Sequence, residues 1–131
     1  MPDAASDSRG NGPERMGLMS TTPGRAFLDR RLELIIAGDF EGMVDAGYND
    51  DALLVDFAAQ VRGKDALKEH FRTHLSMLGG VQLKSVDKFA ETDDAVFFEL
   101  TVITGQWGEV TSYEAFVLRD GKADYHFTTL R

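Results

Sequence analysis

The spacing of hydrophobic positions changes along the chain, from a helical period in the first half to a strand period in the second. Between residues 23 and 78 the large apolar residues recur mostly three or four positions apart, as on one face of a helix. From residue 81 onward they alternate with polar residues, as in strands that bury one face. A group of helices followed by a group of strands predicts an α+β domain with antiparallel pairing rather than parallel βαβ units.

Three helices are predicted, and residues typical of helix ends mark them. The first begins at Pro23, which is tolerated in the first helical turn, and ends at Gly38. Asp39 then caps a short second helix. The third helix follows Gly63 and ends at the glycine pair 79–80.

Five strands are predicted. A short apolar strand follows a turn at 49–51, and turn residues separate the other four strands, most clearly at Arg119-Asp120-Gly121. The predicted strands cover residues 52–57, 81–89, 95–104, 110–119 and 123–130.

Length and composition fit one globular domain with a tail. The chain has 131 residues, of which 43% are hydrophobic and 27% are charged, so it can build one core. Residues 1–21 are rich in Gly, Ser, Asp and Pro and have no hydrophobic period, which predicts a flexible tail before a domain over 22–131. We expect a cytoplasmic protein, because there is no secretory signal and no apolar run approaches the ~18 residues of a membrane span.

Charge and residue usage argue against several kinds of chemistry. The net charge of −8 opposes binding to nucleic acid, and no membrane partner is expected. The chain has no cysteine, and therefore no disulfide and no thiolate metal site. It also lacks a Gly-rich phosphate loop and a nucleophile elbow, so we expect no cofactor.

Four short motifs, taken in order, carry a resemblance to a known superfamily. They are Ala37-Gly38-Asp39, Asp50-Asp51-Ala52 with Asp56, the helix start over 63–67 and the hairpin over 116–122. In this order they resemble the SnoaL-like and ketosteroid-isomerase-like proteins, also called nuclear-transport-factor-two-like, over residues 23–131. The resemblance implies a cystatin-like fold: a cone-shaped α+β barrel with three N-terminal helices packed on a curved mixed or antiparallel sheet.

The resemblance also implies a cavity between the sheet and the helices. Different relatives, polyketide cyclases among them, use this cavity for isomerisation, cyclisation, dehydration, epoxide hydrolysis or binding alone. Because one fold serves many functions, the function must be argued from individual residues.

Asp56 is the first candidate for chemistry. It ends an apolar strand, and beside Leu54 and Phe57 its carboxyl would be partly desolvated, as in many general bases. The resemblance implies the same role, since Asp56 falls on the position of the isomerases' base. The structural alternative is that Asp56 caps the turn before Arg62-Gly63.

Glu114 and His126 are the other candidates. Period-2 counting places Glu114 on the inward face of its strand with Phe116, where an acid must be paired, protonated or lining a cavity. The resemblance aligns Glu114 with an acid that, when protonated, donates a hydrogen bond to a substrate oxyanion; the alternative is a salt bridge at the sheet edge. Matching to the family turns His126 toward the cavity, where it could relay a proton, orient Glu114 or be a neutral wall residue.

The sequence departs from the isomerases in the first helix. Arg31 stands where the resemblance places their oxyanion-binding tyrosine, which argues against a steroid-type isomerase. Tyr48 could reach the cavity from another element. The residues expected to line the pocket are Leu32, Tyr48, Leu54, His70, Phe98, Phe116 and Leu130.

His70 and His74 lie four residues apart in the predicted third helix. This spacing can hold a metal ion when a third ligand converges. No further zinc motif accompanies them, so we expect no metal site and interpret His70 as a core-facing or pocket-lining residue.

The leading hypothesis is a cofactor-independent isomerase, cyclase or dehydratase that moves protons on an apolar, carbonyl-bearing small molecule. Asp56 would be its base and Glu114 its acid or hydrogen-bond donor. The alternative is a non-catalytic ligand-binding or dimerisation module of the same fold.

The outward phases of the strands predict a homodimer through the outer face of the sheet, because they are largely apolar where a wet face should be polar. The residues on these phases are Ala95, Phe97, Ile103, Tyr113, Ala115, Val117, Tyr125 and Phe127.

Overall fold

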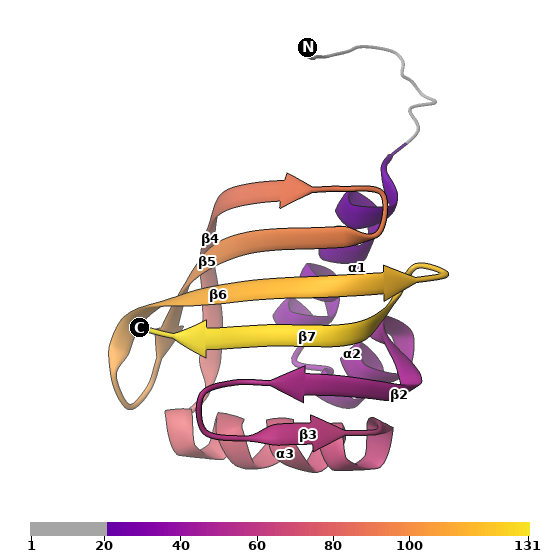
Figure 1. Cartoon of the computed structure of the whole chain (residues 1–131). Coiled ribbons are helices and arrows are strands. Elements are labelled where there is room, and N and C mark those ends of the chain that lie inside the picture. The colour runs from indigo at the N-terminus through magenta and orange to yellow at the C-terminus, as the bar shows by residue number, and fades with distance from the viewer. Residues whose placement is uncertain (1–20) are drawn as a thin grey trace.

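The computed structural model describes residues 21–131, in which three helices pack on one face of a curved sheet (Figure 1). The helices are α1 (Pro23–Ala37), α2 (Phe40–Gly47) and α3 (Lys64–Leu78). The strands are β2 (Tyr48–Val55), β3 (Gln60–Arg62), β4 (Val81–Glu91), β5 (Ala95–Thr104), β6 (Gly108–Arg119) and β7 (Lys122–Leu130). Residues 1–20 of the predicted tail lie outside the described residues. No helix of residues 21–131 combines the length and the apolar composition needed to cross a membrane.

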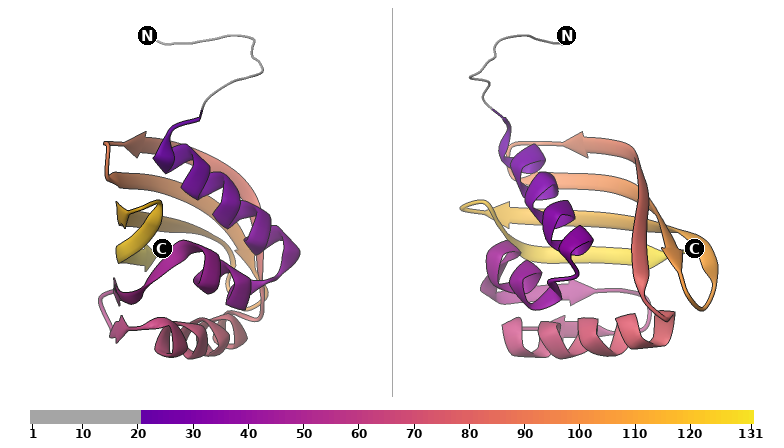
Figure 2. Two further views of the ribbon diagram at one scale, coloured as in Figure 1. Left: turned by 90° about the vertical axis from the view of Figure 1, so that its right-hand side faces the viewer. Right: turned by 180° about the vertical axis from the view of Figure 1, so that it is seen from behind.

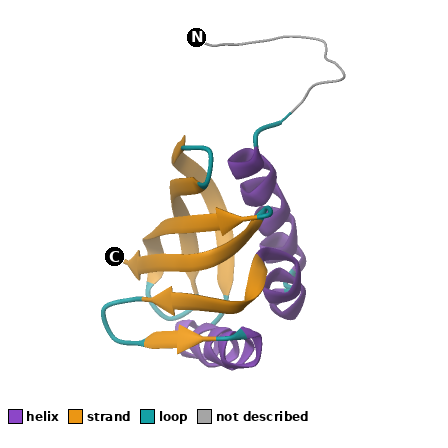
Figure 3. Ribbon diagram, turned by 45° about the vertical axis from the view of Figure 1, so that its right-hand side comes forward, coloured by secondary structure: helices purple, strands orange, loops and turns teal. Residues whose placement is uncertain are grey.

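The sheet is mixed and open. Its strand order is β3-β2-β7-β6-β5-β4, so within the described residues β3 and β4 form its two edges. Strands β4 to β7 pair antiparallel, whereas β2 pairs parallel with β7. The sheet curves around the helices, which all lie on its concave side (Figures 2 and 3). The expected α+β architecture, with helices on a curved mixed sheet, is confirmed.

The helix ends follow the predicted signals. The hydroxyl of Thr22 accepts a hydrogen bond from the backbone N–H of Arg25 at 3.2 Å and so caps α1. Gly38 ends α1 with a φ of 73°, a left-handed conformation that glycine adopts without steric cost. Asp39 accepts a hydrogen bond from the backbone N–H of Gly42 at 2.8 Å and caps α2.

The region before Asp56 differs from the prediction. The residues expected to form a turn at 49–51 belong to β2, which starts at Tyr48 and not at residue 52. The side-chain amide of Asn49 donates hydrogen bonds to the backbone carbonyls of Arg119 and Lys122, each at 3.2 Å. Asn49 therefore ties β2 to the β6–β7 hairpin, a long-range contact that outweighs the local turn preference of the segment. The three-residue strand β3 was not predicted either.

The strand phases agree with the predicted inward and outward faces. In β6 every second residue from Ser112 to Leu118 is buried, which includes Glu114. In β7 His126 is buried, with 1% of its surface exposed, whereas Tyr125 and Phe127 are exposed at 44% and 46%. The inward side chains of the sheet and the apolar faces of the helices form one core.

The end of α3 is fixed by a close approach of two glycines. The backbone N–H of Gln106 donates a hydrogen bond to the carbonyl of Leu78 at 2.8 Å, which brings Gly105 of the β5–β6 hairpin against Gly79. A Cβ atom on Gly105 would lie 2.3 Å from the carbonyl oxygen of Gly79, far inside van der Waals contact. This contact positions α3, and with it His70 and His74, against the sheet.

We therefore expect Gly105→Ala to lower the free energy of unfolding by about 1–3 kcal/mol, the range typical of overpacking, because backbone atoms must move apart. Urea unfolding of the two proteins measures the change. Gly47→Ala is the matched control, since its Cβ would make an ordinary contact of 3.7 Å with Phe27. Equal unfolding midpoints for wild type and Gly105→Ala would contradict this account of how α3 is fixed.

Candidate functional site

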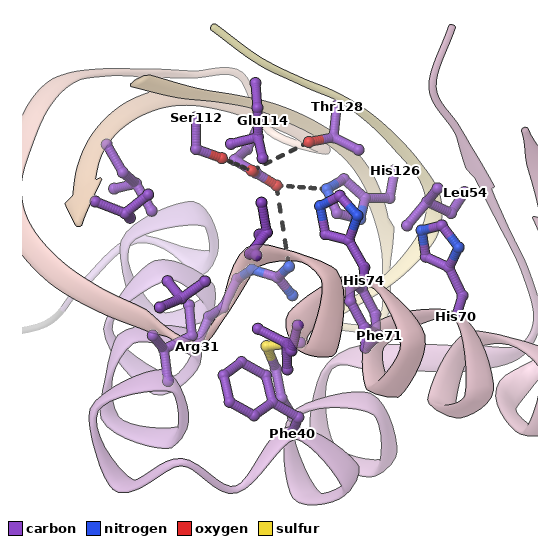
Figure 4. Close-up of a pocket in the computed structure, with 18 of the residues that line it drawn as sticks. Arg31, Phe40, Leu54, His70, Phe71, His74, Ser112, Glu114, His126 and Thr128 are labelled. Atoms are coloured by element: carbon purple, nitrogen blue, oxygen red, sulfur yellow. Dashed lines mark hydrogen bonds and ion pairs between the residues drawn. The ribbon is translucent and has the colours of Figure 1, made fainter. Parts of the chain in front are cut away.

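A cavity of about 110 Å³ lies between the helices and the concave face of the sheet (Figure 4). Because one water needs ~10–15 Å³ measured in this way, the cavity has room for a molecule of roughly ten non-hydrogen atoms. Most of its wall is apolar and comes from the three helices, β4 and β5. Its polar lining residues are Arg31, Asp56, His70, His74, Ser112, Glu114, His126 and Thr128.

Glu114 is the centre of a buried hydrogen-bond network on the sheet side of the cavity. One carboxylate oxygen, Oε2, accepts hydrogen bonds from the hydroxyls of Ser112 and Thr128, the latter at 3.1 Å. The other, Oε1, lies 2.6 Å from Nε2 of His126 and 3.9 Å from Nη2 of Arg31. Both oxygens of Glu114 are therefore engaged by protein groups.

The network continues from His126 to α1. Nδ1 of His126 lies 2.8 Å from the hydroxyl oxygen of Tyr48, and that hydroxyl accepts a hydrogen bond from Nη1 of Arg31 at 3.2 Å. Strand register brings these groups together, since Glu114 pairs with Thr128 and Leu54 pairs with His126 across neighbouring strands. Both ring nitrogens of His126 are thus occupied.

Burial and charge set the protonation of the network. Burial would raise the pKa of Glu114, but the His126 ring, the Arg31 guanidinium and the Ser112 hydroxyl lower it to about 2. Burial lowers the pKa of His126 against the opposing effect of Glu114, and raises the pKa of Tyr48 to about 12. At neutral pH the network therefore contains an ionised Glu114, a neutral His126 and a protonated Tyr48.

These protonation states give the hydrogen bonds one direction. Arg31 donates to Tyr48, Tyr48 donates to Nδ1 of His126, and Nε2–H of His126 donates to Glu114. The tautomer of His126 is inferred from this pattern of donors and acceptors. Of the three alternatives for an inward acid, the structure shows two for Glu114, since it is paired with Arg31 and His126 and lines the cavity.

Asp56 lines the same cavity from the loop between β2 and β3. Its Oδ1 accepts hydrogen bonds from the backbone N–H groups of Ala58 and Ala59, at 2.8 and 2.7 Å. It therefore caps the turn after β2, as the structural alternative had it, and also lines the cavity. The geometry is compatible with both roles for Asp56.

His70 and His74 form the α3 side of the site. Both are half-buried and line the cavity, with their rings stacked at a centroid separation of 5.7 Å and an interplanar angle of 11°. Burial and the neighbouring His74 lower the pKa of His70, and Asp56 opposes this change. Within residues 21–131 no group of three or more potential metal-ligating side chains is arranged to hold a metal ion.

A family model described as a SnoaL-like domain matches residues 25–126, most of the chain. The chain belongs to the SnoaL-like family. No curated protein matches the sequence.

Solved structures share this SnoaL-like fold at low sequence identity. TerC, co-crystallised with polyporic acid, is similar with a TM-score of 0.73 and 20% identity, over 84% of this chain and 92% of TerC. An NTF2-like protein from Burkholderia pseudomallei has a TM-score of 0.73 and 14% identity, over 85% and 92% of the two chains. An NTF2-like protein from Anabaena variabilis has a TM-score of 0.69 and 19% identity, over 88% and 96%.

The structure places the predicted site residues of this SnoaL-like chain in two groups. Asp56, Glu114 and His126 line one cavity, together with Leu54, His70 and Leu130. The other expected pocket residues belong to the core instead: Phe98, Phe116 and Tyr48 are buried there, and Leu32 packs against it. Tyr48 still acts on the site, because its hydroxyl bonds to His126.

Sequence reasoning missed the part played by Arg31. The side chain is 6% exposed, it lines the cavity, and it forms the ion pair with Glu114. The helical period could have predicted the burial of Arg31. This residue follows Phe27 by four positions and Leu28 by three, and so lies on the buried face of α1. His74 was likewise weighed only as a metal ligand.

The buried network predicts a specific loss of stability in acid. The ordinary pKa of Glu114 is 4.5 and the folded value is about 2, so between these values the unfolded chain binds more protons and stability falls as the pH falls. This group should contribute stability that is present above pH 4.5 and is lost toward pH 2.

Urea unfolding of wild type and Glu114→Gln measures this contribution. We expect the stability difference between them to narrow as the pH falls from 6 to 2, because the carboxylate of the folded wild type must then be protonated. Glu33→Gln, on the exposed side of α1, is the control, and its difference should stay within about 0.5 kcal/mol of zero. A Glu114→Gln difference that is constant with pH would show that Glu114 is not held ionised.

Proposed function

We propose that the chain is a cofactor-independent enzyme that moves protons on an apolar, carbonyl-bearing small molecule of the polyketide, steroid or terpenoid kind. The observation that supports this proposal is the arrangement of the cavity. The Asp56 carboxyl and the Arg31 guanidinium line one space whose remaining wall is mainly apolar. A base and a positive charge at the edge of an apolar space suit the formation of an enolate.

In this proposal Asp56 takes a proton from the carbon next to the substrate carbonyl. The C–H electron pair becomes the new C=C bond, and the carbonyl π electrons move to the oxygen, giving an enolate. The field of Arg31 stabilises that negative charge. Where the substrate has a second C=C bond conjugated with the enolate, return of the proton to the far carbon of that bond gives an isomer, and the step needs no oxidant, reductant or metal.

Glu114 and His126 act as positioning groups in this scheme. Ser112, Thr128, His126 and Arg31 already engage both Glu114 oxygens. Glu114 holds the Arg31 guanidinium at the cavity and fixes the tautomer of His126. It therefore does not donate a hydrogen bond to the substrate.

A non-catalytic binding module is the second candidate, and one observation favours it. The Glu114 carboxylate and the His126 ring have their hydrogen-bond partners without a ligand, so the cavity can hold an apolar molecule without any proton transfer. TerC, of similar fold, co-crystallised with polyporic acid, which supports a small organic ligand for either candidate.

Exchange of hydrogen for deuterium in 2-tetralone tests the enzymatic proposal. This apolar ketone has about the number of atoms that the cavity can hold, and NMR in D₂O follows the loss of its signals next to the carbonyl. We expect wild type to accelerate the exchange and Asp56→Asn to reduce it at least about 100-fold, because the amide cannot take up the proton.

Asp51→Asn, an exposed position of β2, is the matched control and should keep the wild-type rate. Asp56→Asn exchanging as fast as wild type would remove the proposed base. Binding of 2-tetralone by wild type without exchange would favour the binding module.

We also propose a homodimer through the outer face of the sheet. Phe97, Tyr125 and Phe127 expose 44–49% of their surface there, and the Tyr125 and Phe127 rings stack at 6.3 Å. Apolar area of this kind on a sheet is usually covered by a partner, and a two-fold axis would bring two such faces together.

Light scattering at micromolar concentration should give twice the chain mass of 14.5 kDa. Phe97→Glu should shift the mass to that of one chain, since it would bury a charge in the interface. Met77→Glu, on the exposed side of α3, should leave the dimer intact. A single-chain mass for wild type would refute the dimer.

A further inference from the structure

The proposed chemistry requires a hydrogen-bond donor at the cavity, and within the Glu114 network Nε of Arg31 is buried without a hydrogen-bond partner. Removal of a proton next to a ketone is helped by a hydrogen-bond donor at the carbonyl oxygen, where the negative charge develops. Glu114 cannot be that donor, because its carboxylate is ionised and accepts hydrogen bonds from its neighbours. His126 has both ring nitrogens engaged, by Tyr48 and Glu114.

The α3 histidines are the remaining ring donors at the cavity. Both line it, and within residues 21–131 neither ring forms a hydrogen bond to another residue. Figure 4 shows the two rings rising from α3 toward the sheet. His70 also packs edge-on against Phe71, with centroids 5.7 Å apart, so contacts on both sides define its orientation.

His70 and Asp56 line the same cavity, one from α3 and the other from the β2–β3 loop. The charge of Asp56 also acts on the His70 ring. Enolisation needs a donor and a base in one cavity, because the proton that leaves and the oxygen that gains charge belong to adjacent carbon atoms. Burial and His74 keep the imidazole of His70 neutral near pH 7, and a neutral imidazole carries one N–H donor.

We propose that His70 is a catalytic residue that donates its ring N–H to the substrate carbonyl oxygen while Asp56 removes the adjacent proton. This inference rests on the proposed function and narrows its substrate class. The substrate is a ketone whose carbonyl lies between α3 and the β2–β3 loop, with its apolar part against the helices, β4 and β5. His74 is a positioning residue that stacks on the donor.

Two substitutions at position 70 separate a hydrogen-bond donor from a packing residue. His70→Leu fills the position with a helix-forming apolar side chain and removes the donor, whereas His70→Gln keeps an N–H donor. In the 2-tetralone exchange assay we expect His70→Leu to lower kcat about 100-fold with little change in KM, because the bond strengthens in the transition state. His70→Gln should recover at least a tenth of the wild-type kcat.

The carbonyl ¹³C resonance of bound, carbonyl-labelled 2-tetralone gives a readout that does not depend on turnover. A donor polarises the carbonyl and moves this resonance downfield. We expect the shift in wild type and in His70→Gln, and its loss in His70→Leu. Met77→Leu, on the exposed side of the same helix, is the control for both measurements.

The outcomes distinguish this inference from the proposed function. Two results would overturn the role of His70: a kcat of His70→Leu within twofold of wild type, or an equal loss of kcat in His70→Leu and His70→Gln. In either case, exchange catalysed by wild type would still support the enzyme proposal. If wild type did not accelerate hydrogen exchange in 2-tetralone, the enzyme proposal would fail. The carbonyl ¹³C resonance would then show by itself whether His70 donates a hydrogen bond to the bound ketone. A carbonyl shift unchanged in His70→Leu would overturn that role of His70.

Discussion

The ion pair between Arg31 and Glu114 is the constraint on which the rest of the site depends. Taking two charges out of water costs several kcal/mol for each ion, and their attraction offsets this only when further hydrogen bonds satisfy them. Here Tyr48, Ser112, Thr128 and His126 supply those bonds. Because α1, β2, β6 and β7 each contribute at least one member, satisfying the charges also fixes the helix layer relative to the sheet.

The hydrogen bonds within this network determine which polar groups remain available to a ligand. A donor or acceptor that already has its partners must break a bond before it can serve a substrate, at a cost of about 1–3 kcal/mol for a buried group. Glu114 and His126 are in that position. Asp56, at the end of β2, and the histidines of α3 face the same cavity from outside the network. The site therefore has a fixed sheet side and a reactive side.

The sequence predicted most of this fold and the direction of its strands, because period and end signals act locally. Glu114 was expected to face inward for that reason, and β6 buries it. Its protonation could not be predicted, since one deciding partner, Arg31, lies far away in the chain and its contact with Glu114 forms only in the folded structure. The start of β2 was predicted wrongly for the same reason, because Asn49 forms hydrogen bonds with residues more than seventy positions later. Local rules place a side chain on a face, and tertiary partners decide its charge.

A carboxylate is a much weaker base than the enolate of a simple ketone. Groups around the carbonyl must therefore stabilise the enolate if proton removal is to be fast. The turn at Ala58 and Ala59 holds Asp56 in place through two backbone donors. The Arg31–Glu114 pair supplies a fixed dipole that needs no reorganisation when charge develops. What separates a catalyst from a binding protein on this framework is therefore a donor at the carbonyl oxygen. In this chain such donors lie on α1, where the buried Nε of Arg31 has no hydrogen-bond partner, and on α3, the helix whose end is fixed by the contact of Gly79 with Gly105.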